Sequence, residues 1–132
     1  MKQLIECVPN FSEGRNMEVI RQITEVIEKA EGVKLLDVDP GATTNRTVVT
    51  FVGTPEEVVE TAVAVIAKAK ELIDMRNHHG DHPRFGATDV CPLVPVSNIT
   101  MEETAQYARK LAERVGNELG VPVYCYENAA FE

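Results

Sequence analysis

Short apolar runs alternate with amphipathic segments along the chain, and this alternation constrains the fold more than any other feature. Strand-like runs are predicted at residues 3–8, 33–38, 45–52, 90–96 and 121–126. Apolar residues recur at helical spacing in three further stretches, at residues 19–30, 55–73 and 101–119. The resulting order is β-α-β-β-α-β-α-β, whose first six elements match the ferredoxin-like split βαβ pattern. We therefore expect an α+β domain whose helices lie mainly on one face of the sheet.

Capping residues mark where the three helices begin. Asn16 is a plausible cap for the first helix, and Thr54-Pro55-Glu56-Glu57 combines a threonine cap with proline at the first helical position. Thr100-Met101-Glu102-Glu103 has the spacing of a capping box. The third helix should end at Gly120, because Pro122 follows and cannot continue it.

Three segments read as connections or irregular structure. Residues 9–14 (PNFSEG) are a loop by composition, and residues 39–44 (DPGATT) are a turn-rich connection between two antiparallel strands. The run 90–96 contains Pro92 and Pro95, which favours an irregular or edge strand.

Charge and length exclude several classes of protein. A chain of 132 residues is the right length for one domain, and it can bury a hydrophobic core without a disulfide bond or a structural metal. The formal net charge of −8 disfavours nucleic acid and anionic membrane as partners, so an anionic ligand would need a local basic cluster. No run has the length of a signal peptide or a membrane span. Three widely spaced cysteines read as reduced, buried thiols, which predicts a cytoplasmic protein.

All three histidines, His78, His79 and His82, lie within five residues of a segment without periodicity. A metal site is one hypothesis, but the sequence lacks further histidines to complete the three or four ligands that zinc usually takes. General acid–base catalysis is the second, since imidazole titrates near ~6.5 and Pro83 restricts the backbone of His82. In the third, the histidines interact with the last carbonyls of the preceding helix. The composition of this segment does not decide among these three hypotheses for His82.

Other polar residues carry weaker signals. Asp37 and Asp39 lie on either side of a predicted strand end, and the pattern Asp-x-Asp-Pro-Gly is most typical of a turn. Arg46 could bind a carboxylate through two parallel hydrogen bonds or be an ordinary surface residue. Cys91 lies beside Pro92 without an activating neighbour in sequence, so a buried, inert thiol is expected.

Several strings occur together in an order that is far more specific than any single motif. They are Val8–Gly14 (VPNFSEG), Leu36–Asp39 (LDVD), Thr44–Val48 (TNRTV), His78–Arg84 (HHGDHPR) and Gly86–Pro95 (GATDVCPLVP). With these strings the chain resembles the formiminotransferase family, in its N-terminal subdomain, from Glu6 to about Tyr126. The resemblance implies one formiminotransferase N-terminal subdomain over residues 1–132.

The resemblance implies transfer of the formimino group from N-formimino-L-glutamate to N5 of tetrahydrofolate, in histidine breakdown and one-carbon metabolism. His82 matches the family's catalytic base, tetrahydrofolate is the co-substrate, and no metal is implied. Five further residues fall in matching strings and are expected to bind formiminoglutamate or folate: Asn10, Asp39, Arg46, His79 and Arg84.

Members of the family usually carry a second α/β subdomain, with folate bound between the halves, and that second half is absent from this sequence. The resemblance therefore implies a partner: a separate C-terminal subdomain chain, or another copy in a homo-oligomer. A half-domain that binds folate or assembles without turnover is the alternative function. A metallohydrolase-like fragment is a third.

Overall fold

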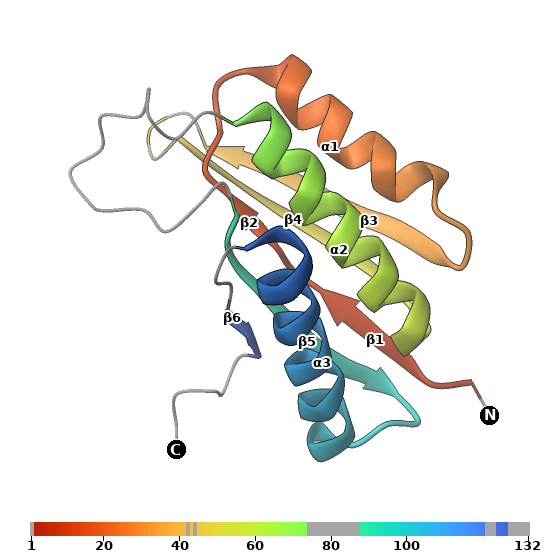
Figure 1. The fold of residues 1–132 in the computed structure, drawn as a ribbon. Helices are drawn as coiled ribbons and strands as arrows, with labels where there is room; N and C mark the ends of the chain where they lie inside the picture. Colours follow the sequence, from red (N-terminus) through yellow and green to blue (C-terminus); the bar gives the residue numbers. More distant parts are fainter. Residues whose placement is uncertain (1, 42, 44, 74–87, 121–123, 127–132) are drawn as a thin grey trace.

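The strands pair into a single mixed sheet in which the split βαβ order is complete (Figure 1). The computed structural model describes residues 2–41, 43, 45–73, 88–120 and 124–126. Its strands are β1 (Leu4–Cys7), β2 (Asn10–Phe11), β3 (Val33–Gly41), β4 (Arg46–Gly53), β5 (Thr88–Ser97) and β6 (Tyr124–Tyr126). Its helices are α1 (Met17–Lys29), α2 (Pro55–Leu72) and α3 (Met101–Leu119).

Strands β1 and β2 follow one another between β4 and β5, because each of them pairs with both neighbours. Strand β3 pairs with β4 on one side of this centre, and β6 pairs with β5 on the other. All pairings are antiparallel except β5–β6, which α3 joins as a parallel crossover. The ferredoxin-like α+β prediction is confirmed, and α3 with β6 extends that sheet by one strand.

The core lies between the sheet and the helices, which all lie on the same side of it (Figure 1). Residues that alternate along the central strands point toward this side and are almost completely buried: Ile5, Cys7, Val49, Phe51, Cys91 and Leu93. They pack in one cluster with Ile23 and Ile27 of α1, Val58 and Ile66 of α2, and Leu111 and Val115 of α3. Because side chains alternate across a strand, the intervening residues point to the opposite face of the sheet.

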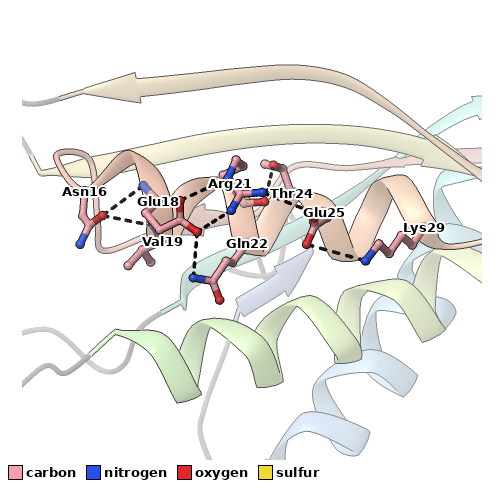
Figure 2. A network of polar contacts seen from close by, with 8 residues as sticks. All are labelled: Asn16, Glu18, Val19, Arg21, Gln22, Thr24, Glu25 and Lys29. Atoms are coloured by element: carbon pink, nitrogen blue, oxygen red, sulfur yellow. Dashed lines mark hydrogen bonds and ion pairs between the residues drawn. The ribbon is translucent and has the colours of Figure 1, made fainter.

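Helix α1 begins as the sequence predicts, and its solvent face carries a chain of polar contacts (Figure 2). Asn16 Oδ1 accepts hydrogen bonds from the backbone N–H groups of Glu18 (3.1 Å) and Val19 (3.3 Å). Arg21 bonds Glu18 at 2.5 Å, and this hydrogen bond lowers the pKa of the Glu18 carboxyl. These exposed pairs contribute little to stability, so the buried stripe Ile20, Ile23 and Ile27 holds the helix in place.

The other two helix starts differ in how their threonines are used. Thr100 forms the expected capping box: its hydroxyl accepts from Glu103 N–H at 3.0 Å, and the Glu103 carboxylate accepts from Thr100 N–H at 3.0 Å. Thr54 precedes Pro55 as predicted, but its hydroxyl donates to Glu57 Oε1 at 2.5 Å and caps no backbone N–H group. Of these two threonines, only Thr100 therefore caps its helix with its side chain.

Helix α3 packs against α2 and ends at the expected glycine. Gly120 has a left-handed φ of 70°, and its N–H reaches the carbonyls of Val115 and Gly116. Lys70 of α2 donates to the carbonyl of Leu119 at 2.6 Å, which satisfies an acceptor at the end of α3.

Strand pairing overrides two local expectations, and it confirms that β5 is irregular. The segment Asp39–Gly41, expected in a turn, belongs to β3 and pairs with residues 46–48. Asn10 and Phe11, expected in a loop, form the short strand β2. β5 is irregular as predicted, with register shifts in its pairings, but it is not an edge strand, because it lies between β1/β2 and β6. Its prolines keep their carbonyl acceptors, and Pro92 O accepts from Val8 N–H at 3.0 Å.

β3 pairs with β4 alone among the strands that the structure describes. Its pairing shifts register between Leu35 and Asp37, which leaves Leu36 as the extra residue of a bulge. No helix within the described ranges is long and apolar enough to span a membrane.

Candidate functional site

The sheet face opposite the helices, here called the open face, collects polar residues from motifs that are distant in sequence. Strand alternation and register assign the polar residues and valines of several strands to it. They are Glu6, Asn10, Lys34, Asp37, Asp39, Arg46, Val48, Thr50, Val52, Val90 and Val94. None of the described helices covers this face (Figure 1).

Three of the residues expected to bind substrate meet at one end of the open face. Asn10 of β2 and Asp39 of β3 both pair with Val48 of β4, so the three form one row across the sheet. Neighbouring strands lie about 4.8 Å apart, which puts the backbones of Asn10 and Asp39 about 10 Å from each other. Arg46 is two residues from Val48 on the same face, about 7 Å along the strand. We call Asn10, Asp39 and Arg46 the polar end.

The polar end combines groups with different exposure. Arg46 and Asp39 are exposed, whereas Asn10 is half-buried. The Asn10 side chain is oriented by its Nδ2 group, which donates to the carbonyl of Val8 at 3.1 Å. Its Oδ1 atom can therefore accept a hydrogen bond from a ligand, while Arg46 can bind a carboxylate.

A close backbone contact joins the loop after β2 to the turn between β3 and β4. A Cβ atom on Gly14 would lie 2.3 Å from Gly41 O and 2.5 Å from Arg46 N, so only glycine fits here. Gly14 N–H donates to Asn45 Oδ1 at 2.9 Å, with Asn45 itself in the left-handed region at φ 54°. Thr47 Oγ1 donates to Glu13 O at 2.5 Å and fixes the same loop. We call this contact the Gly14 junction.

The Gly14 junction brings two of the motifs together in space. One runs through Asn10 to Gly14, and the other includes Asn45 and Arg46. Because the contact involves backbone atoms, it sets the position of Arg46 relative to Asn10 with little freedom. Sequence reasoning did not assign a role to Gly14 or Asn45, although a loop glycine and an asparagine before a strand are both signals for special backbone geometry.

His79, His82 and Arg84 lie outside the described residues, in the segment 74–87. Its described neighbours are Ile73, which follows α2, and Thr88, which begins β5 beside Phe11 of β2. Val90, two residues after Thr88, pairs with Asn10. Thr88 Oγ1 is the buried side-chain polar atom that has no hydrogen-bond partner within the described part of the chain.

Cys91 is fully buried on the helix-covered face, away from the polar end. Its Sγ atom lies 3.3 Å from Cys7 Sγ, and the hydrogen bond between the two thiols, together with burial, raises the Cys91 pKa well above its ordinary value. A thiol in this environment is a poor nucleophile, as the sequence suggested. No group of three or more His, Cys, Asp or Glu side chains that could hold a metal occurs among the residues whose positions are described.

Comparison with known proteins places these features in a family. Residues 4–132 match the family described as "Formiminotransferase domain, N-terminal subdomain". The chain belongs to the formiminotransferase family. The polar end and the Gly14 junction are therefore features of a formiminotransferase N-terminal subdomain.

Relatives with curated names share much of the sequence. The chain is 56% identical over 130 residues to formimidoyltransferase-cyclodeaminase of Sus scrofa, covering 98% of this chain and 24% of the relative. It is 59% identical over 130 residues to the protein of the same name in Gallus gallus, with the same two coverages. It is 45% identical over 130 residues to glutamate formimidoyltransferase of Streptococcus pyogenes serotype M1, covering 98% of this chain and 44% of that protein. The chain thus spans less than half the length of these three relatives.

Proposed function

We propose that this chain supplies one half of the site of a cytoplasmic transferase that moves the formimino group from N-formimino-L-glutamate to N5 of tetrahydrofolate. Family membership and the names of the relatives support this reaction class. The observation that carries the proposal is the polar end, where Asn10, Asp39 and Arg46 share the open face, which none of the described helices covers.

The charges of the polar end suit the two substrates. Formiminoglutamate and the folate tail both carry carboxylates, and the net charge of −8 on this chain repels them in general. Arg46 offers a planar guanidinium for a carboxylate, and Arg84 is proposed to act in the same way. Asn10, Asp39 and His79 are proposed to orient the polar groups of folate or of the formimino donor.

His82 is proposed as the general base. As the N5 lone pair attacks the formimino carbon, the imidazole takes the proton from N5, and a tetrahedral intermediate forms. The intermediate then collapses: the bond to the glutamate nitrogen breaks, and the imidazolium returns the proton to that nitrogen. An imidazole suits this exchange because its pKa of about 6.5 lets it accept and release a proton near neutral pH.

A second α/β subdomain is proposed to cover the open face. Val48, Val52, Val90 and Val94 make part of this face apolar, and the relatives extend well beyond the region that this chain matches. A cover over these valines would also exclude water from the polar end and so strengthen its interactions with carboxylates. A separate chain or a second copy of this one would supply the cover.

The direct test is formimino transfer by the purified chain, alone and fused to the C-terminal part of the Streptococcus relative that lies beyond the matched region. We expect rapid transfer only by the fusion, because fusion gives the two halves a high effective concentration. The C-terminal part alone is the control.

Transfer by the chain alone would support the proposed reaction but contradict the need for a second subdomain. Tetrahydrofolate binding without transfer in either form would support a folate-binding half-domain instead. The absence of both transfer and folate affinity would contradict the proposal.

Replacing Arg46 by glutamine in the fusion should raise the KM of a carboxylate substrate. A hydrogen bond to a charged group contributes about 1.5–3 kcal/mol, so we expect an increase of about 10–100-fold with a small change in kcat. Lys34→Gln is the matched control, because it removes the same charge from the open face at the level of Val52, away from the polar end. Equal effects of the two substitutions would mean that Arg46 acts only through net charge.

A further inference from the structure

We propose that Cys7 and Cys91 form a buried dithiol that oxidants of the peroxide class convert into a reversible disulfide between β1 and β5. The two cysteines are 84 positions apart in sequence, and their Sγ atoms lie 3.3 Å apart in the core. This site is separate from the proposed transfer reaction, because both side chains point to the helix-covered face.

The strand register explains why the two thiols meet. Cys7 pairs with Leu93 of β5, and Cys91 precedes Leu93 by two residues, so the cysteines are diagonal neighbours on one face of an antiparallel pair. A disulfide bond is about 2.05 Å long, so the sulfur atoms must approach by only about 1.2 Å from their present separation.

Burial decides when the pair reacts. Both residues are 0% exposed and lie within the apolar cluster that Phe51 and Leu93 also line. The hydrogen bond to Cys7 and burial raise the pKa of the Cys91 thiol, and neither sulfur is accessible to an oxidant while the core is closed. Oxidation therefore requires a local opening of the sheet that admits a small oxidant.

The reaction balances with hydrogen peroxide as the oxidant. One thiol loses its proton, its sulfur attacks a peroxide oxygen, and the O–O bond breaks. A sulfenic acid forms, and the leaving hydroxide takes up that proton to become water. The second sulfur attacks the sulfenic sulfur, the S–O bond breaks, and the disulfide and a second water form. Two electrons pass from the thiols to the peroxide. The short Sγ–Sγ distance makes the second step fast, which limits further oxidation to sulfinic acid.

The test treats the folded, reduced chain with hydrogen peroxide, blocks the remaining thiols with N-ethylmaleimide and maps tryptic peptides without reduction. Cleavage after lysine and arginine separates the cysteines into the fragments 3–15, 85–109 and 115–132. We expect fragment 3–15 linked to fragment 85–109 as the main product, and its loss after treatment with dithiothreitol.

The same oxidation in denaturant provides the control. Cys91 and Cys125 are 34 positions apart, whereas Cys7 and Cys91 are 84 apart. Loop-closure entropy in an unfolded chain then favours the Cys91–Cys125 link by about fourfold. A native product dominated by Cys7–Cys91 would reverse this preference, and it should be lost in Cys7→Ser and retained in Cys125→Ser.

Two results would overturn the proposal. One is a native product dominated by the Cys91–Cys125 link, as in the denatured control. The other is oxidation of Cys91 to sulfinic acid in the folded chain without any link to Cys7. Neither result would bear on the proposed formimino transfer.

Discussion

Replacing His82 by alanine in the active fusion is expected to lower the rate of formimino transfer by about 10²–10⁴-fold, the usual contribution of a positioned general base. Tetrahydrofolate affinity should change little, because the proposed role of His82 is proton transfer. Steady-state kinetics and a separate folate-binding measurement distinguish the two effects. The acidic limb of the pH profile of kcat/KM, along which a histidine base becomes protonated, should disappear in the variant.

His78→Ala is the matched control for this experiment, since His78 is another histidine of the same segment and has no proposed contact with substrate. Added imidazole should restore part of the activity of His82→Ala, and it should leave the activity of His78→Ala unchanged. An unchanged transfer rate in His82→Ala would remove the base assignment while leaving the family and the fold intact.

Gly14→Ala should disrupt both the stability of the domain and the proposed site. The new Cβ would meet three backbone atoms, Gly41 O at 2.3 Å, Arg46 N at 2.5 Å and Arg46 O at 2.7 Å, and none of them can rotate away. We expect a loss of about 1–3 kcal/mol in the free energy of unfolding, as for other overpacked positions. Transfer by the fusion should also fall, because the loop after Asn10 must move away from Arg46. Urea denaturation and the transfer assay measure the two effects.

Gly116→Ala is the matched control, because a Cβ there has no neighbour within 4 Å and the residue lies inside α3. That substitution should stabilise the chain by about 0.5–1 kcal/mol through helix propensity. If both alanine variants were stabilising, the Gly14 junction would not be the tight contact that the distances indicate.

Local sequence signals predicted the helices well and the strand ends poorly. Asn16 and Thr100 act through residues two or three positions away, so their capping roles can be read from short motifs. The strand character of Asp39 and Pro40 depends instead on pairing with Val48 and Thr47 across the sheet. Proline and aspartate favour turns locally, and only the partner strand overrides that preference.

In the candidate site, too, local motifs predicted single residues but not the arrangement that depends on strand pairing. Motif strings named Asn10, Asp39 and Arg46 separately, but their common row follows from the order of β2, β4 and β3 in the sheet, which no single string contains. The Gly14 junction was missed because a tight approach between two backbones leaves no signal beyond the glycine itself. The proximity of Cys7 and Cys91 was also missed, since it depends on the register of β1 against β5.

The bulge in β3 has a consequence for how the chain behaves among its own copies. A long, regular outer strand offers free backbone groups to any other strand and can seed aggregation. In β3, the extra residue at Leu36 breaks the regular spacing, Lys34 adds a charge, and Pro40 removes an N–H donor. These three features disfavour the pairing of β3 with a strand of another chain. Newly made chains at high local concentration are therefore protected from aggregation through this side of the sheet.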